Sequence, residues 1–286
     1  MDDFVSTEWL ADNLGAEDLA IVDCTAFLPN MPRNAMTEFA AAHIPGARFL
    51  DISEVADKSH PAPHMLPSAA DFGAAMERLG VGRDERIVIY DNSPLRTAAR
   101  GWFMFRHFGA DQVAVLDGGF QKWLAEGRPV ESGEARPRPG RRFHAVETEG
   151  EVVSKADILE GTDLPIVDAR SMARFTGEDP DPRPTVASGH IPGARSLPMS
   201  ALYREDGTFR VAEEIRALFA EAGVDPARPF IASCGSGVTA NSLLLASRRI
   251  GGAAGKLYDG SWSEWGADPA TPKEQGPAKG LAGPAR

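Results

Sequence analysis

Hydrophobic and polar positions along this 286-residue chain alternate between short apolar runs and longer amphipathic segments. The runs at 86–91 and 229–234 are short and mostly apolar, which is typical of buried strands. The segments 72–80 and 214–223 have apolar residues at helical spacing and end in glycine, a residue favoured at helix C-termini. Strands that alternate with helices predict an α/β fold with a mainly parallel sheet.

The same pattern occurs twice in the chain. Three segments return about 145 residues further on, with the same spacing of their Asp, Pro, Gly or Trp residues. They are 21–27 and 166–172, 42–53 and 189–200, and 116–123 and 258–265. A repeat of this length is a duplicated domain rather than a solenoid unit. The sequence therefore predicts two tandem domains, each with a mainly parallel sheet flanked by helices.

Composition shifts place the domain boundaries. We expect an N-terminal domain over residues 1–133 and a linker rich in Pro, Gly and charge over 134–148. The C-terminal domain is expected over 149–270. The last stretch, 271–286, has no hydrophobic pattern and is predicted to be a flexible tail.

Charge and hydropathy exclude several classes of protein. The formal net charge is −11, which argues against a nucleic-acid surface because phosphate binding needs a basic footprint. No apolar run approaches the roughly 18 residues of a membrane span. The first residues are acidic and amphipathic, unlike a secretory or transit peptide, so a cytoplasmic location is expected.

The two cysteines, Cys24 and Cys234, are too few for a zinc site built on thiolates. Cys24 follows a predicted strand without a glycine-rich loop, which favours core packing. Cys234 lies between a predicted strand and a predicted helix in the segment S-C-G-S-G-V-T-A. The free N–H groups at the start of that helix favour an anion, and therefore the thiolate over the thiol.

The loop around Cys234 has the residue types of an anion site. Gly235 and Gly237 would allow positive φ, so that successive N–H groups point inward. Ser236 and Thr239 add hydroxyl donors. The first repeat has Asp91 where the second has Cys234, and it lacks the glycines, so only the second repeat is expected to carry nucleophilic chemistry.

Together these features resemble the tandem-domain rhodanese family over about residues 4–270. The resemblance rests on the paired HIPGA motifs, on DGG and DGS before a Trp-containing helix, on HMLPS at 64–68, on Asp in place of the first Cys, and on the Cys loop that ends in GVTA. It implies two rhodanese-like domains, of which only the second is catalytic.

Within that family the residues after the cysteine distinguish the sulfur donor. Thiosulfate-preferring members have basic residues there, whereas this chain has Gly235 and Ser236, the type associated with 3-mercaptopyruvate sulfurtransferases. The resemblance thus implies a small anionic donor, 3-mercaptopyruvate, with thiosulfate as the alternative. A dianion such as thiosulfate would gain more from cations beside the cysteine.

Two arginines have the spacing of the pair that holds the substrate carboxylate and ketone oxygen in the mercaptopyruvate subfamily. They are Arg174 and Arg183. The planar guanidinium suits this role because it can bind a carboxylate through two hydrogen bonds. Without the resemblance, a solvated surface pair within an acidic loop would be the better interpretation.

The resemblance also implies a role for a histidine of the first domain. His43, in the first HIPGA motif, is the candidate to pair with Ser236 and an upstream acid, but the nearest upstream polar residue is Asn34 and no Asp lies at the expected place. His190, in the second motif, is expected to be structural, because the motif occurs in both domains and the chemistry in one.

The predicted reaction has two halves. The Cys234 thiolate takes sulfur from the donor, and the N–H groups of Gly235, Ser236, Gly237, Val238 and Thr239 stabilise the resulting persulfide. Thioredoxin, another thiol or cyanide then removes the outer sulfur. No metal or organic cofactor is implied.

Two other functions fit the sequence less well. A cysteine phosphatase needs an Arg six residues after the Cys, where this chain has Ala240, and a non-enzymatic scaffold would not need the intact loop.

Overall fold

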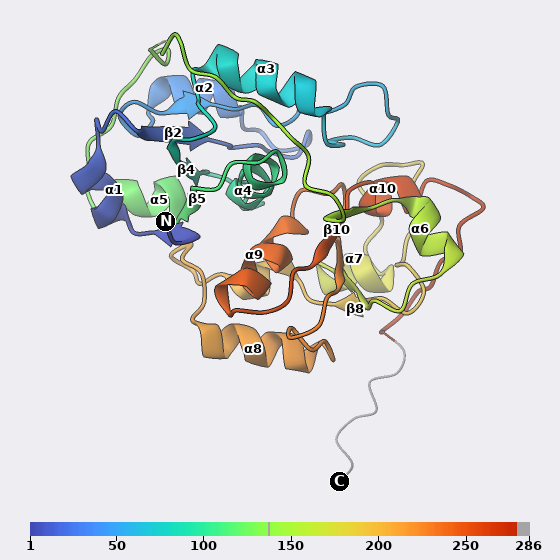
Figure 1. Cartoon of the computed structure of the whole chain (residues 1–286). Coiled ribbons are helices and arrows are strands. Elements are labelled where there is room, and N and C mark those ends of the chain that lie inside the picture. The colour runs from blue at the N-terminus through green and yellow to red at the C-terminus, as the bar shows by residue number, and fades with distance from the viewer. Residues whose placement is uncertain (137, 279–286) are drawn as a thin grey trace. The chain divides into compact units, whose positions relative to one another are not determined.

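The computed structural model describes residues 1–136 and 138–278, and they form two compact units (Figure 1). Each unit contains a five-stranded sheet whose strand pairs are parallel. The predicted α/β fold with two tandem domains is therefore confirmed.

The sheet of the first unit has the strand order β1-β5-β4-β2-β3. Its strands are β1 (Phe4–Val5), β2 (Leu19–Asp23), β3 (Arg48–Phe49), β4 (Arg86–Tyr90) and β5 (Val113–Leu116). Its helices are α1 (Thr7–Asn13), α2 (Ala35–Ala41), α3 (Ala69–Leu79), α4 (Ala98–His107) and α5 (Gly119–Ala125). Helix α3 ends at Gly80 in the left-handed conformation, as the sequence pattern predicted.

The second unit repeats this topology with the order β6-β10-β9-β7-β8. Its strands are β6 (Val152–Val153), β7 (Ile166–Asp168), β8 (Arg195–Ser196), β9 (Ile231–Ser233) and β10 (Lys256–Tyr258). Its helices are α6 (Lys155–Glu160), α7 (Met172–Thr176), α8 (Ala212–Glu221), α9 (Asn241–Arg249) and α10 (Ser261–Trp265), with a 3-10 turn at Met199–Leu202. Identical strand order in both units is what a duplicated domain requires.

Each unit also includes a short segment from the other half of the sequence. Residues Lys58–Met65 cluster with the second unit, and Tyr203–Phe209 with the first. In the first unit, the Phe209 ring lies 4.9 Å from that of Phe4, and the Phe209 N–H donates to Asp117. In the second, His60 Nε2 lies 3.9 Å from a carboxylate oxygen of Glu264. The domain boundaries predicted from the sequence are continuous and do not contain this exchange of segments.

The structure differs from the expected flexible tail in residues 271–278. Thr271 is buried, and its hydroxyl donates to backbone carbonyls of Trp265 and Asp268. His190 and Glu274 form an isolated antiparallel bridge with backbone distances of 2.8 and 3.0 Å. These contacts pack the segment against the second unit. Residues 279–286 of that tail lie outside the described residues.

Matching strands β2 and β7 end in buried carboxylates that are compensated in different ways. Asp168 is paired with the equally buried Arg170, with a shortest N–O distance of 2.6 Å. Asp23 has Thr25 at the matching position and accepts a hydrogen bond from its N–H at 2.8 Å. Burial raises the pKa of Asp23 to about 6, against the opposing effect of hydrogen bonds from Thr25 and Tyr90.

This difference predicts opposite responses to the same substitution. Because the pKa of Asp23 is higher in the folded chain than in the unfolded chain, the unfolded chain loses this proton first as pH rises. The free energy of unfolding therefore falls as pH rises from the unfolded pKa towards about 6. Asp23→Asn cannot ionise and so lacks this loss. The free energy of unfolding of the variant minus that of the native chain should therefore be about 1 kcal/mol higher at pH 8 than at pH 5. Urea unfolding at both pH values measures this. A pH-independent effect would contradict it.

The matched control is Asp168→Asn. It leaves Arg170 buried without its counter-ion and should cost about 3–5 kcal/mol at both pH values.

Candidate functional site

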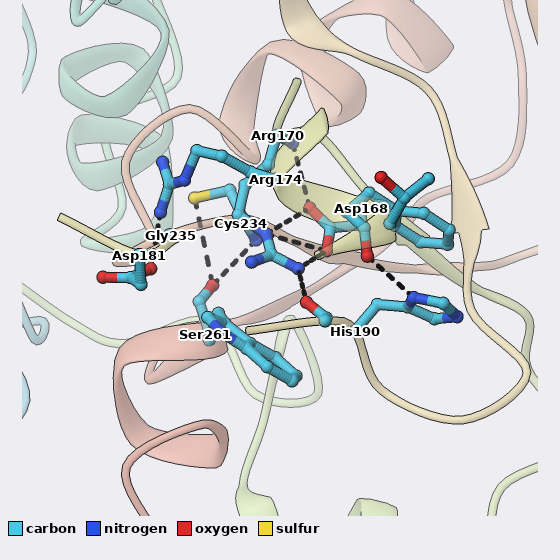
Figure 2. Close-up of polar contacts among 12 residues, drawn as sticks. Asp168, Arg170, Arg174, Asp181, His190, Cys234, Gly235 and Ser261 are labelled. Carbon is cyan, nitrogen blue, oxygen red and sulfur yellow. Dashed lines mark hydrogen bonds and ion pairs between the residues drawn. The ribbon is translucent and has the colours of Figure 1, made fainter. Parts of the chain in front are cut away.

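Cys234 begins the loop between β9 and α9, and the first residues of α10 hold that loop in place (Figure 2). The Cys234 N–H donates to Ser261 Oγ at 3.0 Å. The N–H groups of Trp262 and Ser263 donate to the carbonyls of Cys234 and Gly235 at 3.0 and 2.8 Å. The Cys234 side chain is nearly covered, with 1% of the residue exposed. Cys234 is therefore held by hydrogen bonds of its own backbone at the carboxyl end of a central strand.

The two glycines of the loop have different functions. Gly237 has φ +71°, and a Cβ there would collide with the backbone carbonyl oxygen of Asp259. Gly235 has no positive φ, which corrects the expectation that both glycines need one, and its Cβ would lie in ordinary contact, 3.4 Å from Arg174 Nη2. Gly237 thus permits the turn, whereas Gly235 leaves space beside the guanidinium groups.

Val238 and Thr239 complete the turn into α9. Val238 is 6% exposed and packs inward, while the Thr239 carbonyl accepts the Ser242 N–H at 3.2 Å. Asn241, the first residue of α9, donates from its side-chain amide to the carbonyls of Gly237 and Val238 at 2.7 and 2.8 Å. This amide ties the loop to the helix that follows it.

Arg174 and Arg183 both bind one buried carboxylate, that of Asp181. Figure 2 shows the contact of Arg174. Arg174 Nη2 lies 2.7 Å from Asp181 Oδ2, and Arg183 Nε lies 2.7 Å from Oδ1. Burial pushes the pKa of Asp181 upward, but the hydrogen bonds and charges of the two arginines outweigh it and hold the pKa below its usual value. The pair is therefore built around a buried acid and is not a solvated surface pair.

The arginine pair also adjoins Gly235, the residue after Cys234. Arg183 Nη2 donates to the Gly235 carbonyl at 3.2 Å, and Arg174 Nη1 and Nη2 face the position of a Gly235 Cβ. The structure thus brings Cys234, Arg174 and Arg183 together. A donor whose sulfur reaches Cys234 would have its other end beside two guanidinium groups, which suits a carboxylate.

The histidine that contacts the Cys234 loop is His64. His64 Nδ1 lies 3.1 Å from Ser236 Oγ, and His64 has a positive φ of 62°, an uncommon conformation for a residue with a side chain. The contact joins residues 172 positions apart in the sequence. The HMLPS motif was the available signal, because it marks this loop, but the sequence does not show which loop the histidine meets.

His43 has a structural environment instead. Its ring stacks on Phe39 with centroids 4.1 Å apart, and Nδ1 lies 2.8 Å from the Phe39 carbonyl oxygen. His190 repeats this arrangement on Phe175, at 3.8 Å and 2.8 Å. Both histidines therefore hold the HIPGA turns. The expectation that His43 pairs with Ser236 is corrected, because His64 occupies that place.

Sequence reasoning also missed Ser261. This residue is fully buried and has φ +48°, whereas the matching residue of the first repeat is Gly119, with φ +58°. A left-handed conformation costs a non-glycine residue roughly 1–2 kcal/mol. Ser261 supplies a hydroxyl that accepts from the Cys234 N–H and lies 3.9 Å from Sγ.

The loop of the first repeat carries a buried carboxyl group, that of Asp91. One of its oxygens accepts the Ser93 N–H and the other accepts the Ala98 N–H, both at 2.8 Å. Burial raises the pKa of Asp91, against the opposing effect of these two hydrogen bonds. Nearby Cys24 is fully buried, and its pKa is raised well above the usual value because burial and the charges of Asp23 and Asp91 disfavour the thiolate. This half has a carboxyl group, and no thiol, at the matching position.

Among the residues that the structure describes, no three or more His, Cys, Asp or Glu side chains gather as metal ligands would. None of the helices there is long and apolar enough to cross a membrane.

Comparison with known proteins then places the chain in a family. The description of a rhodanese-like domain matches residues 6–126 and again residues 154–268. The chain belongs to the rhodanese family. Human 3-mercaptopyruvate sulfurtransferase is 41% identical over 270 residues, which cover 91% of each chain. Rat thiosulfate sulfurtransferase is 39% identical over 284 residues, 95% of each.

A solved rhodanese structure supports the same assignment. The crystal structure of SseA from Escherichia coli, a 3-mercaptopyruvate sulfotransferase, superposes with a TM-score of 0.83 at 38% identity and covers 92% of this chain and 100% of its own. The protein is therefore a sulfurtransferase, an enzyme that moves sulfur from a donor to an acceptor.

The two loop glycines predict unequal tolerance of a methyl group. Gly237→Ala should destabilise the protein by about 1–3 kcal/mol, because it adds left-handed strain and a collision with the Asp259 carbonyl. Gly235→Ala should change stability by no more than about 0.5 kcal/mol. Urea unfolding of both variants measures the difference, and equal effects would show that Gly237 does not set the turn.

Proposed function

We propose that this enzyme transfers the sulfur of 3-mercaptopyruvate through a persulfide on Cys234, releases pyruvate, and passes the sulfur to a thiol such as thioredoxin or to cyanide. The observation that carries this proposal is the Arg174–Arg183 pair, which binds Asp181 and adjoins Gly235 directly after the nucleophile. A substrate with a carboxylate next to a carbonyl matches two adjacent guanidinium groups.

In the first half-reaction the Cys234 thiolate attacks the donor sulfur. The new S–S bond forms as the C–S bond of the donor breaks, and the electron pair leaves on carbon as the enolate of pyruvate. Arg174 and Arg183 orient the donor and favour the negative charge that moves onto its oxygen. The enolate then takes a proton and leaves as pyruvate. Ser236, hydrogen-bonded to His64, is the hydroxyl placed to assist this proton transfer.

In the second half-reaction an acceptor thiolate attacks the outer sulfur of the persulfide. The S–S bond breaks, and its electron pair returns to Cys234 as the thiolate. The N–H groups of residues 235–239 favour the persulfide anion between the two steps. Asp91 supports this assignment, since its carboxylate accepts two N–H groups of the equivalent loop in the first repeat.

Thiosulfate is the second candidate donor, and the 39% identity to rat thiosulfate sulfurtransferase favours keeping it. The local geometry favours the keto acid. The residue after Cys234 carries no charge, and the neighbouring cations are partly neutralised by Asp181. The leaving sulfite of thiosulfate would have less compensation there than the enolate and carboxylate of mercaptopyruvate.

The site assignment predicts different outcomes for the two cysteines. Cys234→Ser should abolish sulfur transfer, because a serine hydroxyl is a far weaker nucleophile at neutral pH. Cys24→Ser should retain most activity, because Cys24 is buried and its thiolate is disfavoured. Intact-mass spectrometry after treatment with 3-mercaptopyruvate should show one added sulfur in the native chain. Peptide mapping that found this sulfur on Cys24 would overturn the assignment.

The arginine pair predicts a loss for the keto-acid donor. Arg174→Gln or Arg183→Gln should each lower kcat/KM for 3-mercaptopyruvate by roughly ten- to a hundredfold, the effect of about 1.5–3 kcal/mol from a charged hydrogen bond. Part of this loss should fall on kcat, because orientation is lost along with binding.

The matched control for these variants is Arg228→Gln. Arg228 is exposed in the same unit, and its loss should change kcat/KM less than twofold. Losses of equal size in all three variants would mean that general charge, and not contact with the donor, explains the effect.

A further inference from the structure

We propose that Asp181 is the residue that sets the donor preference, because it reduces the charge of the Arg174–Arg183 pair to match a donor with a single carboxylate. The inference rests on the proposed function, in which these arginines bind the donor. It assigns Asp181 as a positioning and specificity-determining residue that acts through the two guanidinium groups.

The contacts of Asp181 are made almost entirely with these two side chains. Its side chain is only 1% exposed, although it is charged. Oδ2 accepts from Arg174 Nη2 at 2.7 Å and from Arg183 Nη2 at 2.9 Å. Oδ1 accepts from Arg183 Nε at 2.7 Å and from the Arg183 N–H at 3.0 Å. A buried carboxylate with these partners fixes the distance and the relative orientation of the arginines.

The guanidinium groups keep donors for a ligand. In the part of the chain that the structure describes, Arg174 Nη1 and Arg183 Nη1 donate to no protein acceptor. The side chains are 24% and 29% exposed, so solvent or a ligand can reach them. Arg174 Nη1 also lies 3.6 Å from the position that a Gly235 Cβ would take. Arg174 Nη1 therefore faces the loop directly after Cys234.

The charges at this position add up to one positive charge. Two guanidinium groups contribute two, and the ionised Asp181 removes one. Asp181 stays ionised at neutral pH, because the arginines hold its pKa below the usual value in spite of burial. A net charge of one suits the single carboxylate of a keto-acid donor. A dianion such as thiosulfate would gain more than a monoanion from a second uncompensated charge.

The test is Asp181→Asn, which keeps the shape and one acceptor oxygen but removes the charge. The ratio of kcat/KM for thiosulfate to kcat/KM for 3-mercaptopyruvate should rise about tenfold relative to the native enzyme. The change should appear mainly as a lower KM for thiosulfate, because charge at this position acts on binding. Asp181→Glu, which restores the charge, should return the ratio to within about threefold of the native value.

The matched control is Asp179→Asn, which removes the same charge from the same loop at an exposed position. It should change the ratio less than twofold, because solvent screens an exposed charge. Direct binding of pyruvate, with one charge, and of sulfate, with two, measured by calorimetry, gives a readout that does not need turnover. Asp181→Asn should strengthen binding of sulfate more than binding of pyruvate.

Three results would overturn the proposal. One is an unchanged ratio in Asp181→Asn with equal losses for both donors, since that is the behaviour of a purely structural residue. Another is an equal shift in Asp179→Asn. The third is a raised ratio in Asp181→Glu. Thermal unfolding checks each variant, and if Asp181→Asn does not fold, Asp181→Ser takes its place. A native enzyme that takes no sulfur from 3-mercaptopyruvate would instead refute the proposed function.

Discussion

One backbone hydrogen bond recurs in both units, and the geometry of the site depends on it. The N–H of the aromatic residue at the start of the last helix donates to the carbonyl of the residue directly after the central strand. In the second unit this bond joins Trp262 to Cys234, and in the first it joins Phe120 to Asp91, both at 3.0 Å. Because it uses main-chain atoms, the bond survives exchange of the side chain at the strand end. The position can therefore hold a thiol in one unit and a carboxyl group in the other.

The difference between the units follows from how each loop satisfies its N–H groups. In the first unit Asp91 accepts two of them, so the anion is part of the fold. In the second unit the residue is a small thiol, and the glycine at 237 allows the turn. The same loop length thus accommodates either a carboxyl group or a thiol at its first position. Specific side chains, above all Arg174, Arg183 and Asp181, then surround the second loop alone.

The sequence was sufficient for the features that depend on local pattern. Strand and helix alternation, the duplication and the Cys234 loop all follow from spacing along the chain, and the fold confirms the first two. Other features depend on distant contacts. The Ser236–His64 contact joins residues 172 positions apart, and the burial of Asp181 results from side chains that close around it. In the sequence, the acidic loop between Arg174 and Arg183 is typical of a solvated surface. Hydrophobic periodicity does not indicate that Asp181, and not a neighbouring acid, is the buried one.

Ser261 shows a different limit. The DGS motif marks a turn, but the left-handed φ and the hydroxyl contact with the Cys234 N–H depend on the neighbouring loop. A serine at a position where the first repeat has glycine was a visible signal. The role of Ser261 becomes visible only from the distance between the loop after β9 and the loop after β10.

The exchange of segments 58–65 and 203–209 has an evolutionary consequence. The histidine that contacts Ser236 is encoded in the half of the gene that carries Asp91 in place of the cysteine. Removing that half would remove this histidine from the loop of the other half. Mutations in the two halves are therefore not independent, and natural selection on the Cys234 loop acts on residues well outside the half that carries it.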